Sequence, residues 1–329
     1  MRTIYRLPSR DSMADNISQR TGSLALASRR AAIPSVSLCA IMLNEEAVLY
    51  RSLSFATKFF DEIILVDTGS TDRSLEIASK FPCRVFHMPW KDDFAAPRNF
   101  SISHATSDWI MILDPDEYID PKDHSAFIEL TRQWTIPAYV FQTRNYTNEL
   151  RMIRFQPNDK IYPLTAHFPG YMVSLKTRLF QRRFNYRFEG CFHELLDHSI
   201  MRSGRMPTMT TIPIQHWCHD IPNRTHAERS KLYLRLGLKK VILEPKNSQA
   251  WAEYGTALAI AGYARHAHAS FIRAASLGFG DEPFFLSLFK TSLELGLQSS
   301  AGIWLEKALC ARHPNLTHSH FLYKKAVPV

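Results

Sequence analysis

The stretch Trp109-Ile-Met-Ile-Leu-Asp-Pro-Asp-Glu117 joins five apolar residues to three carboxylates. An apolar run this short, bounded by polar residues, is typical of a strand that is buried on both faces. Carboxylate oxygens beside a crevice suit Mg²⁺ or Mn²⁺ held jointly with substrate phosphates, because Mg²⁺ rarely takes a cage of protein ligands alone. The stretch therefore predicts a divalent cation site at the end of a buried strand.

Three more short apolar runs precede this stretch, and helical patterns separate them. The expected strands are 36–42, 63–66, 85–87 and 109–113, and the expected helices are 45–58, 72–80 and 94–104. Such alternation implies right-handed β-α-β units and a mostly parallel sheet. Ligands of these sheets bind beyond the carboxyl ends of the strands. Because polar clusters follow all four runs, we expect one polar crevice there.

The chain beyond Asp120 changes character twice. A helix is expected from Pro121 to about residue 133, and alternating segments at 139–146, 151–156 and 175–182 predict antiparallel strands added to the sheet. From His226 onward the pattern is helical throughout. These changes predict a catalytic-type α/β domain at 34–225 and a helical domain at 226–329, after a leader at 1–33.

The helical part repeats itself at a fixed offset along the chain. The matching pairs are Trp251 with Phe285, Tyr254 with Leu288, Gly262 with Gly296, Ala267 with Ala301, Phe271 with Leu305, and Ala274 with Ala308. This period of about 34 residues, and the order of residue types within it, resemble tetratricopeptide repeats. Two repeats are too few for a free solenoid, so we expect them to stack on the first domain. Partner binding, self-association and structural capping are all open roles for them.

Composition and charge limit the class of protein. Of the 329 residues, 45% are hydrophobic, which is enough for a sizeable core and excludes a disordered or fibrous chain. The formal charge is +9, and the segment 1–33 supplies +4 of it through six Arg against two Asp. The remainder is mildly basic, which suits a small phosphate-bearing substrate and argues against nucleic acid.

The segment 1–33 is expected to form a disordered basic leader, with a transit-type leader or a basic arm as alternatives. No apolar run approaches the ~18 residues of a membrane-spanning helix. The five scattered Cys, without a Cys-x-x-Cys pair, fit reduced thiols. We therefore expect a cytoplasmic protein, with peripheral contact at the inner face of the membrane as a further expectation.

Four ordered motifs identify a family resemblance. They are Ser37-Leu-Cys-Ala-Ile-Met-Leu-Asn-Glu-Glu46, Asp61-Glu-Ile-Ile-Leu-Val-Asp-Thr-Gly-Ser-Thr-Asp72, Trp90-Lys-Asp-Asp-Phe-Ala-Ala-Pro-Arg-Asn99 and Asp108-Trp-Ile-Met-Ile-Leu-Asp-Pro-Asp-Glu117. Together they resemble glycosyltransferase family 2, whose members have the GT-A nucleotide-sugar fold. The resemblance implies an α/β domain with a Rossmann-like, mostly parallel sheet, followed here by an all-α tetratricopeptide-like domain.

A weaker continuation points to one subgroup of that family. Thr177-Arg-Leu-Phe180, Tyr186-Arg-Phe-Glu-Gly190, His193-Glu194 and then His216 resemble lipopolysaccharide-core glucosyltransferases and peptide S-glycosyltransferases. The resemblance implies an inverting, metal-dependent transfer of a hexose from a nucleotide-diphosphate sugar, with a UDP-sugar as the expected donor. The acceptor is left open between a saccharide, a lipid-linked saccharide of the cell envelope, and a peptide.

The resemblance also implies roles for single residues. Those expected to bind the donor are Asn44, Glu45 and Asp67 at the nucleoside, Asp93, Arg98 and Asn99 at the base and diphosphate, and Asp114 near the ribose. Asp116, the second Asp of the Asp-x-Asp pattern, is expected to ligate Mg²⁺ or Mn²⁺ and so to take part in catalysis.

Glu194 is the expected general base, although a carboxylate in the first turn of a helix would look the same. His193 is a further candidate for the metal or the diphosphate, and His216 is open between a metal ligand, a residue supporting one, and a packed side chain.

Two other functions compete with transfer. A non-catalytic repeat scaffold with a degenerate GT-A domain is disfavoured by the presence of Asp114, Asp116 and Glu194. A sugar nucleotidyltransferase would want a Gly-rich, basic phosphate loop after the first strand, where this chain has the acidic Leu43-Asn-Glu-Glu46. No Gly-x-Gly-x-x-Gly or P-loop pattern occurs, which disfavours dinucleotide oxidoreductases and P-loop NTPases.

Overall fold

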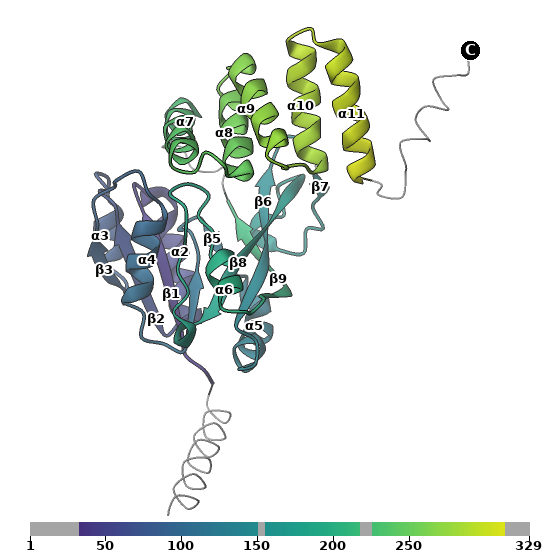
Figure 1. Cartoon of the computed structure of the whole chain (residues 1–329). Helices are drawn as coiled ribbons and strands as arrows, with labels where there is room; N and C mark the ends of the chain where they lie inside the picture. The colour runs from purple at the N-terminus through teal and green to yellow at the C-terminus, as the bar shows by residue number, and fades with distance from the viewer. Residues whose placement is uncertain (1–32, 151–154, 218–225, 313–329) are drawn as a thin grey trace, which may run out of the picture.

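The computed structural model describes residues 33–150, 155–217 and 226–312 of the chain. A sheet with helices on both faces comes first, and a row of helices follows it (Figure 1). The expected leader at 1–33 lies almost entirely outside the described residues. Within them, no helix is both long and apolar enough to cross a membrane.

The first half of the sheet is parallel, as predicted. It consists of β1 (Val36–Met42), β2 (Glu62–Asp67), β3 (Arg84–His87) and β4 (Trp109–Ile112), in the order β3-β2-β1-β4. The connecting helices are α2 (Glu46–Phe59), α3 (Ser74–Ala78) and α4 (Ala95–Ser103). These strands read as continuous apolar runs because both of their faces are buried. Along β1, Leu38 and Ala40 enter one core cluster, while Cys39 between them enters another.

The second half of the sheet is mainly antiparallel. Its strands are β5 (Glu117–Tyr118), β6 (Ala138–Thr147), β7 (Gln156–Pro157), β8 (Gly170–Gln181) and β9 (Thr208–His216). β8 pairs antiparallel with both β4 and β6, β9 pairs parallel with β6, and β5 pairs antiparallel with β9. The complete sheet is therefore mixed, and the expectation of a mostly parallel sheet holds for its first four strands. Of the expected strand at 151–156, residues 151–154 lie outside the described part.

Short helices complete this domain. They are the 3₁₀ turns η1 (Pro121–Asp123), η2 (Pro163–Thr165) and η3 (Arg182–Phe184), with α5 (His124–Thr131) and α6 (Asp197–Arg202). The helix expected from Pro121 is divided into η1 and α5. Asp120 accepts a hydrogen bond from the backbone of Lys122, so it caps the first of these two turns.

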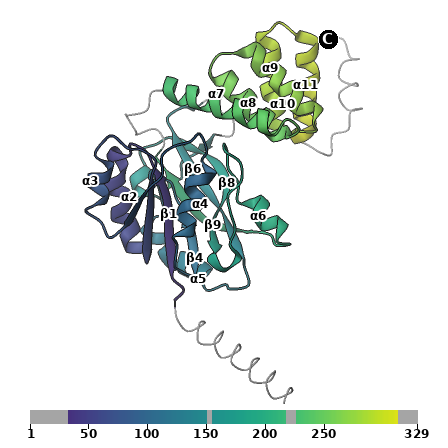
Figure 2. The same cartoon turned by 60° about the vertical axis from the view of Figure 1, so that its left-hand side comes forward.

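The helical region has the period that the sequence predicts. Its helices are α7 (His226–Leu243), α8 (Ser248–Ile260), α9 (Ala264–Ser276), α10 (Glu282–Glu294) and α11 (Gln298–Arg312). The start of α10 follows that of α8 by the same offset that separates α11 from α9, and this is the offset of the sequence repeat. The turns within the two pairs contain Gly262 and Gly296, whose φ values of 84° and 70° suit glycine. Figures 1 and 2 show this region stacked at the edge where β1 ends.

Candidate active site

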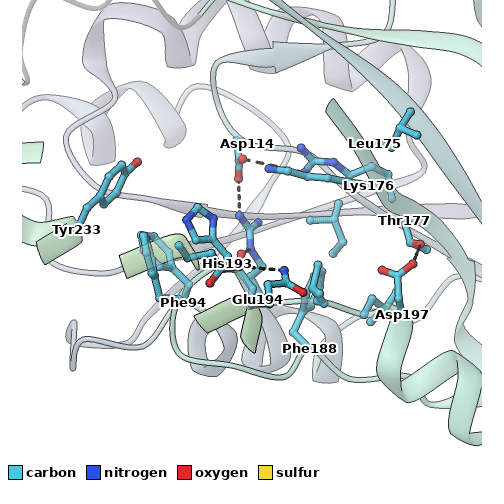
Figure 3. A pocket seen from close by; sticks show the side chains of 18 residues that line it. Phe94, Asp114, Leu175, Lys176, Thr177, Phe188, His193, Glu194, Asp197 and Tyr233 are labelled. Atoms are coloured by element: carbon cyan, nitrogen blue, oxygen red, sulfur yellow. Dashed lines mark hydrogen bonds and ion pairs between the residues drawn. The ribbon is translucent and has the colours of Figure 1, made fainter. Parts of the chain in front are cut away.

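Two adjoining cavities open at the carboxyl ends of the parallel strands. The first, of about 310 Å³, lies beside the ends of β1 and β4, and the second, of about 370 Å³, lies on the side of β8 (Figure 3). Five residues line both: Phe94, Arg98, Asp114, Lys176 and Tyr233. A ligand that spans the two cavities would therefore pass Arg98 and Asp114.

The end of β1 and the loop after β2 form one wall of the first cavity. Asn44 has a φ of 57°, a left-handed conformation that Asn tolerates better than most residues. Its side-chain oxygen accepts hydrogen bonds from the backbone of Thr71 (2.8 Å) and Asp72 (3.3 Å). Asn44 and Glu45 both line the cavity, where a nucleoside could reach them.

Asp67 lies at the end of β2, outside both cavities. Its carboxylate accepts hydrogen bonds from the backbone of Gly69 (3.2 Å) and Ser70 (3.1 Å), and the residue is 3% exposed. It lines neither cavity, whereas its neighbour Thr68 lines the first. In this structure Asp67 shapes the turn that follows β2.

Asp93 and Asn99 also hold the backbone in place. Asp93 accepts a hydrogen bond from the backbone of Ala96 (3.1 Å) at the start of α4. The Asn99 side chain donates to the Phe188 carbonyl (2.9 Å) and accepts from the Phe188 backbone N–H (2.8 Å). Neither residue lines a cavity, although both support segments that do.

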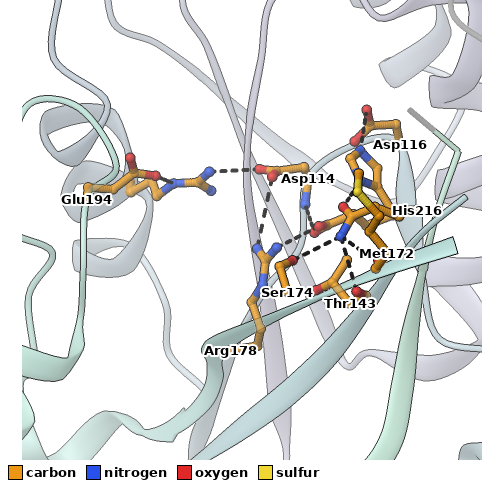
Figure 4. A network of polar contacts seen from close by, with 11 residues as sticks. Asp114, Asp116, Thr143, Met172, Ser174, Arg178, Glu194 and His216 are labelled. Atoms are coloured by element: carbon orange, nitrogen blue, oxygen red, sulfur yellow. Dashed lines mark hydrogen bonds and ion pairs between the residues drawn. The ribbon is translucent and has the colours of Figure 1, made fainter. Parts of the chain in front are cut away.

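Asp116 lies beside His216 in the first cavity. The pairing of β5 with β9 puts Glu117 opposite His216, and this register brings the His216 Nε2 atom to 3.1 Å from Asp116 Oδ2 (Figure 4). The amide of Asn145 donates to the carbonyls of Thr143 and Met172, so its oxygen faces His216 Nδ1 at 2.8 Å.

That network assigns the proton of a neutral His216 to Nδ1, and Nε2 then presents a lone pair towards a carboxylate. Burial lowers the pKa of His216, but the charge of Asp116 and the hydrogen bond to it outweigh burial and raise it. Asp116 and His216 are the side chains that would hold a divalent cation at this place. A metal-ligating imidazole commonly donates its other ring N–H to an oxygen acceptor, as His216 does to Asn145, and a carboxylate with an imidazole suits Mn²⁺ better than Mg²⁺, which prefers oxygen ligands.

The structure brings His216, and not His193, to Asp116. His193 lines the second cavity while Asp116 lines the first. Within the described residues, no group of three or more His, Cys, Asp or Glu side chains could hold a metal ion. A cation at Asp116 and His216 would need further ligands from substrate and water, which is usual for Mg²⁺.

Arg98 connects the two cavities electrostatically. Its Nε atom donates to Glu194 (2.5 Å) and its Nη2 atom donates to Asp114 (2.9 Å), and its side chain is 9% exposed (Figure 4). Arg178 lies 4.0 Å from the other Asp114 oxygen and donates to Glu117 at 2.5 Å. Burial would raise the pKa of Asp114, but the two guanidinium groups outweigh it and hold that pKa well below the usual range.

Glu194 lines the second cavity and is 12% exposed at its side chain. Its Oε1 atom is bound by Arg98, and no hydrogen bond to Oε2 is found among the described residues. A carboxylate that lines a cavity with one oxygen held in place suits the role of a general base.

Some lining residues were missed by sequence reasoning. Lys176 lines both cavities, Arg178 lines the second, and Tyr233 reaches both from α7. The charge of Arg178 and then burial lower the pKa of Lys176. Lys176 and Arg178 alternate along β8 around Thr177, a pattern that could have been noticed. Tyr233 carried no signal, because an aromatic residue in a helix is ordinarily a packing residue.

The chain is similar to a known protein family and to several known proteins. Residues 37–198 match a family model described as glycosyl transferase family 2. The chain is 32% identical over 218 residues to a TPR repeat-containing protein of Synechococcus elongatus, covering 63% of this chain and 49% of that protein. It is 25% identical over 174 residues to the SPbeta prophage-derived glycosyltransferase SunS of Bacillus subtilis, covering 52% and 37%.

The chain thus spans about half or less of the length of these two relatives. Among solved structures, it resembles a mannosyltransferase of Pyrobaculum calidifontis, PcManGT in complex with GDP-Man and Mn²⁺. That match has a TM-score of 0.42 and 16% identity, and it covers 87% of this chain and 89% of the other.

Proposed function

We propose that this chain is an inverting, metal-dependent hexosyltransferase, because residues 37–198 match the glycosyl transferase family 2 model and contain the four motifs that resemble this family. Its donor would be a nucleotide-diphosphate sugar, with UDP as the expected nucleotide. The observation that carries the proposal is the Arg98 bridge. It joins Glu194 in the second cavity to Asp114, which lines both cavities.

The donor belongs in the first cavity under this proposal. Asn44 and Glu45 would contact its nucleoside, and Arg98 and Lys176 supply positive charge towards the diphosphate. Asp116 and His216 would hold Mg²⁺ or Mn²⁺, which when bound would act as a Lewis acid on the leaving diphosphate. Phe94 and Tyr233, lining both cavities, would keep water from the reacting carbon.

The acceptor belongs in the second cavity. Glu194 Oε2 would take the proton from an acceptor hydroxyl or thiol while that atom forms a bond to the anomeric carbon. The bond between this carbon and the diphosphate oxygen breaks, and attack from the opposite face inverts the centre. Arg98 holds Glu194 Oε1, so the base is already oriented before the acceptor arrives.

The acceptor class remains a set of three predictions. A saccharide or a lipid-linked saccharide would suit an enzyme that meets the inner face of the membrane, and a peptide would suit the helical repeats. Binding of a protein partner or of a second copy through the repeats is a further proposal. The matched family model favours transfer over a repeat scaffold or a nucleotidyltransferase.

The test is a thermal-shift and donor-hydrolysis panel of UDP-, GDP- and dTDP-sugars with Mn²⁺ or Mg²⁺. We expect one nucleotide class to stabilise the protein in the presence of metal. Asp116→Asn should abolish the metal-dependent part of that shift. Glu194→Gln should keep the shift and lower donor hydrolysis about 10²- to 10⁴-fold, because it removes only the base.

Glu129→Gln is the matched control, since this carboxylate is 62% exposed on α5 and lines neither cavity. It should behave like the wild type in both assays. If no nucleotide sugar stabilises the wild type with either metal, the transferase proposal is wrong.

A further inference from the structure

Helix α7 holds two loops of the catalytic domain by three basic side chains. Arg235 donates to the Asp92 carboxylate (2.6 Å) and Lys239 donates to the Asp92 carbonyl (2.8 Å). Lys240 donates to the carbonyl of Phe192 (2.7 Å), two residues before Glu194. Helix α7 is therefore bound by hydrogen bonds to the loop before α4 and to the loop that carries Glu194, the candidate base.

Lys240 is the central contact because it is buried. It is 5% exposed, and its ammonium group also donates to Glu253 of α8 (2.8 Å). A buried ammonium is unfavourable unless it is paired and hydrogen-bonded. Here one bond goes to a carboxylate of the helical region and another to a catalytic-domain carbonyl. The position of Phe192 is therefore fixed relative to α7 and α8.

The loop that contains Phe192, which Lys240 contacts, has two residues with positive φ. Gly190 has a φ of 91° and His193 a φ of 49°, and the latter is unfavourable for a residue with a side chain. Such conformations persist when the surrounding structure fixes them. The two loops are also joined to each other, because the Phe94 N–H donates to the Cys191 carbonyl (3.0 Å).

The same helices form part of the cavity walls. Tyr233 of α7 lines both cavities, and Gln249 and Glu253 of α8 line the second one with Glu194. We infer that α7, through Lys240, positions the Glu194 loop for proton transfer, so that the helical region is a working part of the active site. The role of Glu194 rests on the proposed function, whereas the holding of the loop does not.

The first experiment is hydrogen exchange by mass spectrometry on the full chain carrying Lys240→Met. The amides of Glu189 and Leu195, which bond to each other's carbonyls, should exchange faster, and those of β1 and β4 should not change. Lys231→Met is the matched control, since Lys231 is an exposed lysine of the same helix. Unchanged exchange at 189–195 in Lys240→Met would overturn the inference.

The second experiment asks whether Lys240 acts through Glu194. Lys240→Met should lower the rate of donor hydrolysis, the assay defined above, about 10²-fold, because misplacing a catalytic group by about 1 Å can cost that much. Binding of the nucleotide-sugar donor, measured by titration, should be unchanged. In a Glu194→Gln background, Lys240→Met should lower the rate by less than about twofold more. Full additivity of the two substitutions would contradict a positioning role.

If Lys240→Met does not fold, Lys240→Met with Glu253→Leu removes both charges and leaves no buried charge unpaired. The same two readouts apply to it. If the wild type has no transfer activity but exchange at 189–195 is faster in the variant, the proposed function is rejected, and the inference that Lys240 holds the loop stands. If the variant has normal transfer activity and unchanged exchange, the inference that Lys240 holds the loop is rejected, and the proposed function stands.

Discussion

The parallel half of the sheet and the part that follows it contribute different things to the two cavities. The parallel half, residues 36–116, supplies Asn44, Arg98, Asp114 and Asp116 at strand ends or in the helix that follows one. The later part supplies partners for two of them: His216, held by Asn145, for Asp116, and Glu194 for Arg98. Neither part holds a complete site by itself.

The difference shows in how the contacts are made. Asp114 and Asp116 are placed by the strand that precedes them. The partner of Asp116, His216, is brought to it by the β5–β9 register, and Arg178 of β8 lies 4.0 Å from Asp114. Glu194, the partner of Arg98, lies in the loop whose Phe192 carbonyl binds Lys240 of α7. Substitutions at the contacts between the two parts should therefore lower the stability of both parts together.

The largest expected effect on stability is at Arg98, where the two parts meet. Arg98→Met removes a buried guanidinium and leaves the half-buried carboxylates of Asp114 and Glu194 without their shared cation. We expect a loss of about 3–5 kcal/mol in the free energy of unfolding, measured by urea denaturation, because breaking a buried ion pair strands charge.

Arg84→Met is the control for this substitution. Arg84 pairs with Glu62 at the far edge of the sheet with 49% of its side chain exposed. Its replacement should cost less than about 1 kcal/mol. Equal losses for the two variants would show that Arg98 does not join the two parts, and the comparison between them would fail.

The same division explains what the sequence alone could predict. The four parallel strands and their helices are local signals, and the strand ends lie within two residues of the prediction. Residues next to those strands do lie at a cavity, as Asn44, Asp114 and Asp116 show. Asp67 and Asp93 belong to the same family motifs but lie outside both cavities, and their carboxylates bind the backbone of the turns that follow them. A motif specifies a position, and only the local hydrogen bonds specify where the side chain points.

The later part could not be predicted to the same depth, because its contacts depend on register. That His216 rather than His193 meets Asp116 follows from which residue of β9 pairs with Glu117. A shift of one residue would turn the His216 side chain to the other face of the sheet. Lys240 carried no sequence signal at all, since a lysine in a helix is usually a solvated residue.

A smaller effect is expected at Asn145, which supports the metal site from the later part. Asn145→Ala removes the acceptor that orients His216, so Mn²⁺ affinity should fall about 10- to 100-fold in a titration with donor present. Asn158→Ala is the control, because Asn158 makes similar bonds to the carbonyls of Thr165 and Phe168 without touching His216. Equal affinities for the two variants would mean that the later part does not tune the cation site.

The smallest effects on stability are expected from glycine-to-alanine substitutions in the helical repeats. They should differ between the first repeat, α8 and α9, which lines the second cavity, and the second repeat, α10 and α11. A Cβ atom added at Gly255 of α8 would lie 2.6 Å from the Phe271 ring, whereas one at Gly302 of α11 would meet nothing within 4 Å. Overpacking costs about 1–3 kcal/mol, and removing a helical glycine returns up to ~1 kcal/mol. Gly255→Ala should therefore destabilise the helical region by about 1–2 kcal/mol in thermal unfolding followed by helical circular dichroism.

Gly302→Ala should stabilise the same region by about 0.5–1 kcal/mol. The counterpart of Gly255 in the second repeat is Phe289, so the two repeats pack their helices differently although their period is the same. The first repeat brings α8 with its cavity residues Gln249 and Glu253 against Phe271 of α9, which leaves no room for a side chain at Gly255. If both alanine variants are stabilised, α8 and α9 can move apart to accommodate a side chain at Gly255. In that case α8 is not held rigidly beside the second cavity.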